Sequence, residues 1–182
     1  EVQYAPGAVM YGEDRSGITE AVRIASEADV VVAVVGDDIG YIGETRSTPT
    51  LQLPGSQRAL LEALCATAKP LILVLVNSKP LILTRYIERA RAIVECFNPG
   101  MQGGVAVAEL LFGELNPSGK LPISFPRHVG QQPVCYSQVR GQHGDRYADL
   151  TQEPLFPFGF GLSYTTYEYS NLRVVTPTLS PG

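Results

Sequence analysis

The segments VVVAVVG (30–36) and LILVLVN (71–77) are continuous aliphatic runs bounded by polar sequence. Runs of this kind, rich in β-branched residues, are typical of strands buried on both faces of a parallel sheet. AIVECF (92–97) and LPISF (121–125) add a third and a fourth strand. Helical periodicity lies between and around the strands, at residues 17–28, 56–68, 84–91 and 103–112. This alternation predicts an α/β layered sandwich with a mainly parallel sheet and helices on both faces.

The two ends of the chain differ from this regular part. VQYA and AVMY, separated by Pro6-Gly7, predict two short strands, so we expect residues 1–28 to form lead-in strands and a first helix. The sandwich domain then occupies residues 29–172. Alternation within residues 165–175 predicts an exposed strand. The composition of residues 173–182, which include TPTLSPG, is that of a linker.

Composition excludes several classes of function. The chain has 182 residues, a net charge of -4, 45% hydrophobic and 18% charged residues, which fits one globular domain that binds neither nucleic acid nor membranes. No apolar run reaches the roughly 18–20 residues that span a bilayer. The first residues, EVQYAPG, lack the basic and apolar regions of a signal peptide. Cys65, Cys96 and Cys135 are too far apart for a zinc knuckle, and we expect neither metal nor cofactor.

The long polar segment from Gly36 to Pro54 is the strongest candidate for a functional site. It leaves the carboxyl end of a predicted strand, where open parallel sheets bind their ligands. It carries the carboxylates Asp37, Asp38 and Glu44, together with Tyr41 and Arg46; this is the set of candidate residues. About 18 extended residues cover roughly 60 Å, so the loop could project about 25–30 Å. The alternative is a solvated loop whose acidic residues only keep it soluble.

Glu95 is a second acidic residue of interest because it lies within an apolar strand. It is either a buried functional acid or a residue at the strand end that faces solvent or an arginine. Asp37 and Asp38 raise the further possibility of a nucleophile within this chain, and in a chain without Trp the tyrosines, Tyr41 among them, are the candidate aromatic contacts for a ligand.

Four ordered motifs carry a family resemblance. GETRSTPTLQLPG (43–55) is similar to the segment that holds the acid/base Glu of glycoside hydrolase family 3. KPLILVLVNSKPL (69–81) is similar to a strand followed by NGRP, except that Ser78 and Lys79 replace Gly and Arg. FNPGMQGGVAVAELLFGELNPSGKLPISFP (97–126) and PLFPFGFGLSYTTY (154–167) are similar to the later motifs. The resemblance extends from about residue 28 to residue 172.

The resemblance implies the second domain of a retaining β-glycosidase that hydrolyses terminal β-linked sugars in oligosaccharides, disaccharides or aryl β-glycosides. Glu44 would be the general acid/base, with Asp38, Tyr41 and Arg46 binding substrate or supporting the loop. An N-terminal (β/α)8 barrel would supply the nucleophile, so this domain would be inactive alone, and residues 173–182 would lead to a fibronectin-like domain. The family resemblance suggests a periplasmic or secreted location. The alternative is a non-catalytic binding or assembly module with the same fold; a flavodoxin-like binder would need phosphate-binding glycines that the sequence lacks.

Overall fold

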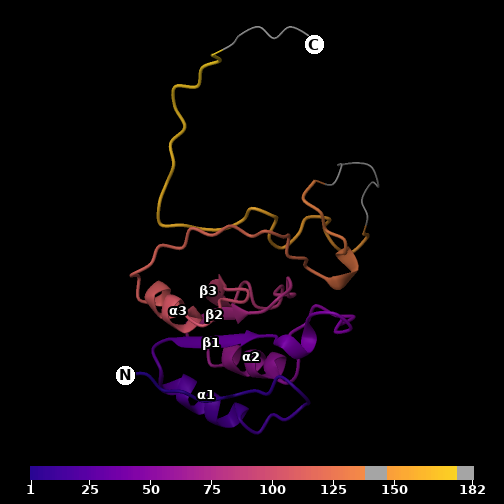
Figure 1. Ribbon diagram of the computed structural model, residues 1–182. Helices are drawn as coiled ribbons and strands as arrows, with labels where there is room; N and C mark the ends of the chain where they lie inside the picture. The colour runs from indigo at the N-terminus through magenta and orange to yellow at the C-terminus, as the bar shows by residue number, and fades with distance from the viewer. Residues whose placement is uncertain (138–146, 176–182) are drawn as a thin grey trace.

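A single parallel sheet organises the chain, whose computed structural model describes residues 1–137 and 147–175. The described strands are β1 (Val31–Gly36), β2 (Leu71–Val76) and β3 (Ala90–Glu95), in the order β1-β2-β3 (Figure 1). β1 and β2 are in continuous register from Val31 opposite Leu71 onward, whereas the β2–β3 register shifts by one residue after Leu71. The predicted α/β class and the parallel strand pairing are confirmed.

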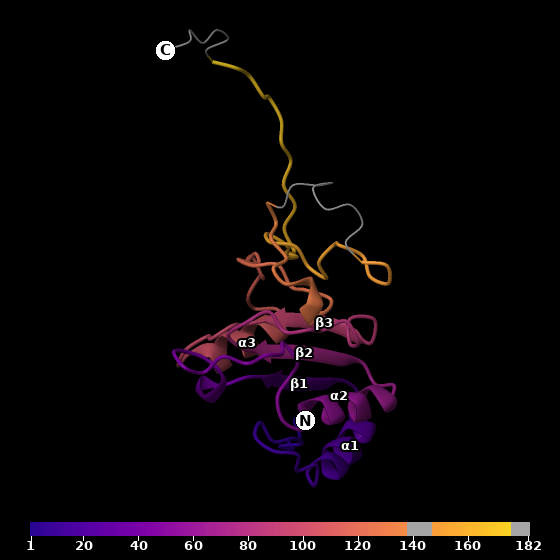
Figure 2. The same cartoon turned by 90° about the vertical axis from the view of Figure 1, so that its right-hand side faces the viewer.

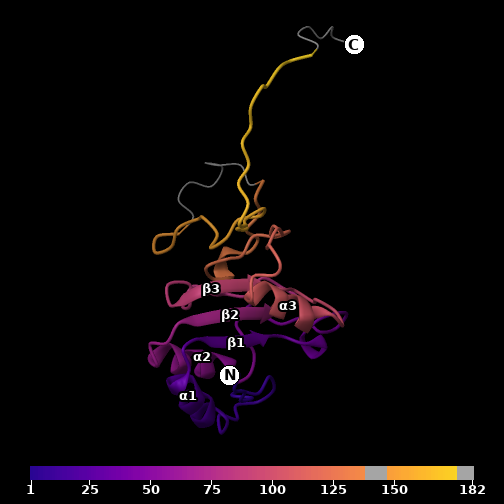
Figure 3. The ribbon, with the colours of Figure 1, turned by 90° about the vertical axis from the view of Figure 1, so that its left-hand side faces the viewer.

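Helices lie on both sides of this sheet, as the sequence predicts. α2 (Gln57–Ala66) packs against β1, and α1 (Ile18–Glu27) packs against α2. α3 (Gly103–Leu111) lies on the opposite side of the sheet (Figures 2 and 3). Two short 3-10 helices, η1 (Ile39–Tyr41) and η2 (Val129–Gln131), lie in the loops.

The hydrophobic core fills the layer between the sheet and the α1–α2 pair. Alternate residues of the strands point into it, because side chains along a strand alternate between the two faces. Ala21 and Ala25 of α1 belong to the same core, so the residues before 29 share the packing of the sandwich. The core includes Ala33, Val35, Leu60, Leu61, Leu64, Leu71, Leu73, Leu75, Leu81 and Phe125.

β1 corrects the expectation that its strand is buried on both faces. Ala33 and Val35 are buried, but Val32 and Val34 are 42% and 63% exposed. The physical reason is incomplete cover: β1 lies at an edge of the described sheet, and Gly103 is the one buried residue of α3. The aliphatic run therefore contains one buried face and one open face.

Two predicted elements in the middle of the chain are absent from the described structure. Residues 84–89 form consecutive turns instead of a helix, because only six residues separate the buried Leu83 from the start of β3, which is too few for a stable helix. Residues 121–125 do not join the parallel sheet. They run beside residues 155–160 instead, with Phe125 in an isolated antiparallel bridge to Phe156. Pro122 and Pro126 remove amide donors that a central strand would need.

The prediction of strands near the two ends of the chain is also wrong. Residues 1–10 contain no strand, because their backbone makes single contacts rather than a ladder. The Ser56 amide donates to the Val9 carbonyl, and the Val9 amide donates to Ser56 Oγ. Residues 165–175 are extended but exposed, and they pair with no other strand in the described part of the chain. Of the expected linker, residues 176–182 lie outside the described residues. No helix among those described is long and apolar enough to cross a bilayer.

Candidate functional site

The base of the long loop is fixed by one buried side chain, Gln57, at the start of α2. Its Oε1 accepts a hydrogen bond from the Gly36 amide at 2.8 Å, and its Nε2 donates to the Gly36 carbonyl at 2.8 Å. Nε2 also donates to the Pro54 carbonyl at 3.0 Å. Gly36 ends β1 and Pro54 precedes α2, so Gln57 joins the two ends of the loop.

Asp37 lies at the carboxyl end of β1 and is turned into the protein. Its side chain is 1% exposed, and its Oδ1 accepts hydrogen bonds from the Ser78 amide at 2.9 Å and from Ser78 Oγ at 3.0 Å. Ser78 follows β2, so this contact joins the ends of two neighbouring strands. A carboxylate held in this way is part of the fold and is not available to a ligand.

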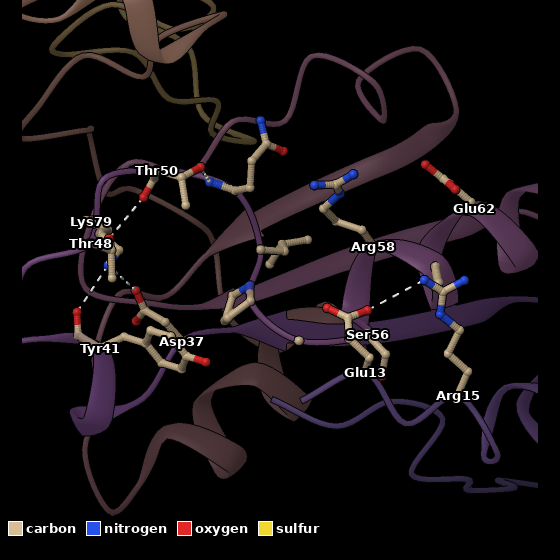
Figure 4. Close-up of a pocket in the computed structure, with 15 residues that line it drawn as sticks. Glu13, Arg15, Asp37, Tyr41, Thr48, Thr50, Ser56, Arg58, Glu62 and Lys79 are labelled. Carbon is tan, nitrogen blue, oxygen red and sulfur yellow. Dashed lines mark hydrogen bonds and ion pairs between the residues drawn. The ribbon is translucent and has the colours of Figure 1, made fainter. Parts of the chain in front are cut away.

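Lys79 contacts the same part of the loop from the other side. Its Nζ donates to the Tyr41 carbonyl at 3.1 Å and to Thr48 Oγ1 at 2.9 Å, and it lies 3.7 Å from Asp37 Oδ2. The side chain is 22% exposed. Figure 4 shows Lys79 between Thr48, Tyr41 and Asp37.

Asp38 and Tyr41 hold the outgoing part of the loop against the lead-in residues. Asp38 caps η1 by accepting from the Gly40 amide at 2.8 Å, and it also accepts a short hydrogen bond from the Tyr11 hydroxyl. The hydrogen bond to Asp38 is the main cause that raises the pKa of Tyr11. The Tyr41 ring stacks on Tyr11 with centroids 5.2 Å apart, and the Tyr41 hydroxyl donates to the Met10 carbonyl at 3.0 Å. Both residues therefore support the loop.

Glu44 and Arg46 lie on the turn farthest along the loop. Gly43 has φ of 98° and Thr45 has φ of 63°, and the Arg46 amide donates to the Gly43 carbonyl at 3.1 Å, which reverses the chain direction. Both side chains are exposed. Within the described parts of the chain, the Glu44 carboxylate makes no hydrogen bond or ion pair. Glu44 thus shares none of the contacts that hold Asp38 and Tyr41, whereas Arg46 lines a second pocket together with Tyr41.

Glu95 ends β3 beside the same edge of the sheet; it is half-buried, and no arginine pairs with it within the described part of the chain. Its carboxylate accepts from the Phe97 amide at 2.8 Å and from Asn77 Nδ2 at 3.4 Å. Burial raises the pKa of Glu95 to about 7, although these two hydrogen bonds act in the opposite direction. Asp37, Asn77 and Glu95 therefore line up at the carboxyl ends of β1, β2 and β3.

A pocket of about 390 Å³ opens beside the returning part of the loop. Thr48 and Lys79 line one end; Arg15 and Arg58 line the other (Figure 4). The pocket is polar and mixed in charge. Among the described residues, no group of three or more His, Cys, Asp or Glu side chains is arranged to hold a metal ion.

Sequence reasoning missed the residues that hold the loop. In the sequence, Gln57 occupies an ordinary position of an amphipathic helix, and Lys79 is notable only because it replaces the Arg of the NGRP motif. The available signal is positional: Ser78 and Lys79 directly follow a buried strand, at the edge from which the loop departs.

Comparison with known proteins identifies the family. The pattern of the glycosyl hydrolase family 3 C-terminal domain matches residues 3–164. The chain belongs to glycoside hydrolase family 3. A relative in the family, the periplasmic beta-glucosidase of Salmonella typhimurium, is 49% identical over 172 residues, which is 89% of this chain and 22% of that protein. A beta-xylosidase of Formosa agariphila is 43% identical over 96% of this chain and 24% of its own length.

Solved family 3 structures have the same fold. A beta-glucosidase involved in saponin metabolism from intestinal bacteria is 50% identical with a TM-score of 0.78, covering 87% of this chain and 23% of that one. The beta-glucosidase of Listeria innocua in complex with glucose is 34% identical with a TM-score of 0.79, covering 87% of this chain and 24% of that one. The chain thus spans about a quarter or less of the length of these relatives, and it corresponds to the C-terminal α/β domain of the family.

Proposed function

We propose that this chain is the acid/base domain of a retaining β-glycosidase and that Glu44 is the general acid/base. The observation that carries the proposal is the placement of Glu44. It is an exposed carboxylate on a tight turn, on a loop that leaves the carboxyl edge of the sheet and is fixed at its base by Gln57. Substrates would be terminal β-linked sugars of disaccharides, oligosaccharides or aryl glycosides.

The chemistry requires a second carboxyl group. Retaining glycosidases use two carboxyl groups about 5–5.5 Å apart, one as nucleophile and one to protonate the leaving oxygen. Asp37 is buried against Ser78, and Asp38 is bonded to Gly40 and Tyr11, so neither of these carboxylates is available as a nucleophile. We therefore infer that the nucleophile comes from another domain, a (β/α)8 barrel, and that this chain is inactive alone.

The roles of the neighbouring residues follow from their contacts. Asp38 and Tyr41 would position the loop, because both are bonded to the lead-in residues. Arg46, exposed on the same turn as Glu44, would contact substrate or the barrel. A periplasmic or secreted location is proposed by analogy with the Salmonella relative.

A chimera tests the proposal. This chain replaces the matching segment of the Salmonella periplasmic beta-glucosidase, and hydrolysis of a β-disaccharide and of an activated aryl β-glucoside is compared with Glu44→Gln. We expect the substitution to lower kcat on the disaccharide about 10²–10⁴-fold, because general acid catalysis matters most for a poor leaving group. Azide should partly restore turnover of the aryl glucoside.

Glu88→Gln is the matched control, because Glu88 is also exposed but lies in the turns before β3. It should leave both rates unchanged. Full disaccharide activity in Glu44→Gln would refute the role of Glu44, and hydrolysis by the isolated chain would refute the division between two domains. A folded chimera that binds sugar but hydrolyses nothing would favour a non-catalytic module.

A further inference from the structure

The Glu44 loop has two legs that run close together before they reach the turn. Tyr41 lies on the outgoing leg, and Thr48 lies on the returning leg. Lys79 bonds to both: its Nζ is 3.1 Å from the Tyr41 carbonyl and 2.9 Å from Thr48 Oγ1 (Figure 4). Lys79 itself follows β2, so it connects the loop to the centre of the sheet.

The ammonium group of Lys79 is paired with the buried carboxylate of Asp37. Asp37 Oδ2 lies 3.7 Å from Nζ, and the Asp37 side chain is 1% exposed. A buried carboxylate is costly unless it is paired, so Asp37 fixes the position of the ammonium group. An ammonium group has three donors and no acceptor, and here three oxygens from three places along the loop surround it. Ser78 holds Asp37 from the other side through its amide and hydroxyl.

We infer that Lys79 is a positioning residue that clasps the two legs of the loop and thereby sets where Glu44 projects. Residues 42–47, between the two clasped positions, include the turn at Gly43 and Thr45. When the legs are fixed, the turn has few conformations; when they separate, the turn and Glu44 gain freedom. The catalytic consequence rests on the proposed role of Glu44, whereas the mechanical one does not.

Hydrogen exchange on this chain tests the clasp directly. The Tyr41 amide donates to the Asp38 carbonyl at 2.9 Å and the Arg46 amide to the Gly43 carbonyl at 3.1 Å, so both amides report on the loop. In Lys79→Met, which keeps length but removes the charge, we expect both to exchange about tenfold faster or more. The Leu73 amide, in the centre of β2, reports on global opening. Lys69→Met, at the amino end of the same strand, is the control and should change neither loop amide.

A second variant separates the clasp from a loss of stability. Lys79→Met leaves Asp37 buried without its cation, so it also destabilises the fold. Lys79→Met with Asp37→Asn removes that unpaired charge. In the double variant we expect exchange at Leu73 to return toward the wild-type rate while Tyr41 and Arg46 stay fast. If the loop amides in Lys79→Met keep their wild-type rates, or slow again together with Leu73 in the double variant, the clasp is refuted.

The catalytic arm uses the chimera described above. Lys79→Met should lower kcat on the disaccharide about tenfold, with KM changed less than about twofold, because misplacing a catalytic group costs mainly the chemical step. Lys79→Arg should recover part of kcat. If Glu44→Gln is as active as wild type, the proposed function fails, and the exchange rates still decide the clasp. If kcat is unaffected by Lys79→Met while the loop exchanges faster, the clasp does not position Glu44 for catalysis.

Discussion

The side-chain amide of Gln57 forms hydrogen bonds with the backbone N–H and C=O of Gly36, as a peptide group of a neighbouring strand would. Its side-chain amide accepts from the Gly36 N–H and donates to the Gly36 carbonyl, both at 2.8 Å. A residue of α2 thus completes the hydrogen bonding of the last residue of β1. The same side chain also reaches Pro54, so one buried amide closes a loop of 17 residues between positions 37 and 53.

Gln57→Leu should therefore destabilise the protein. The substitution keeps the size of the side chain but leaves the amide and carbonyl of Gly36 without these partners in a buried place, and each unsatisfied group costs about 1–3 kcal/mol. We expect the free energy of unfolding, measured in urea, to fall by about 2–4 kcal/mol. Gln52→Leu, on the wall of the pocket, serves as the control. Equal stability of the two variants would mean that the Gln57 bonds do not stabilise the loop base.

Gly36→Ala tests the close approach at the same position. A Cβ on residue 36 would lie 1.7 Å from the Val76 carbonyl oxygen, which β2 cannot move without losing its pairing. We expect a loss of about 3 kcal/mol or more in the free energy of unfolding. Gly104→Ala is the matched change, because a Cβ there meets nothing within 4 Å inside α3. It should stabilise by up to about 1 kcal/mol, since Ala has the higher helix propensity, and thermal unfolding of both variants measures the contrast.

The protonation of Glu95 predicts how stability depends on pH. Burial raises the pKa of Glu95 in the folded state to about 7, above its ordinary value of 4.5. The native state therefore binds this proton more tightly than the unfolded chain, and the free energy of unfolding falls as pH rises from about 4.5 to about 7. Above that range the contribution is constant.

Glu95→Gln should remove this dependence. Between pH 5 and 8, wild type should lose on the order of 2–3 kcal/mol relative to the variant, as urea denaturation at several pH values would show. Asp29→Asn, in the turn before β1, is a control that should follow the wild-type profile. Parallel profiles for wild type and Glu95→Gln would contradict a raised pKa at Glu95.

The two faces of β1 should respond differently to truncation. Val35→Ala removes two methyl groups from the core and should cost about 2 kcal/mol. Val34→Ala, on the open face at 63% exposure, should cost less than about 1 kcal/mol. Chemical denaturation of the pair measures the difference. A loss at Val34 as large as that at Val35 would mean that the open face is covered in solution.

The buried strands and the three longest helices were predictable because each leaves a local pattern. Leu71–Val76 is apolar at every position, and Leu60, Leu61 and Leu64 recur at helical spacing. The turns at 84–89 were not predictable, because they depend on the space between neighbouring elements. The pairing of Phe125 with Phe156 was not predictable either, because it depends on a partner distant in the chain. The prediction of buried side chains failed for the same reason at Val32 and Val34, because the type of a residue does not determine whether another element packs over it.

For the site, the sequence by itself determined that a long acidic loop leaves a strand at the carboxyl edge and that Glu44 follows a glycine within it. Local composition and motif spacing carry that information. Only the tertiary structure decided that the Asp37 carboxylate is hydrogen-bonded to Ser78 and that Asp38 and Tyr41 are hydrogen-bonded to the lead-in residues. It also decided that Lys79 joins the two legs of the loop. These contacts join residues from 27 to 41 positions apart. The contacts with Ser78 and Lys79 form because the parallel strands β1 and β2 bring their carboxyl ends to one edge.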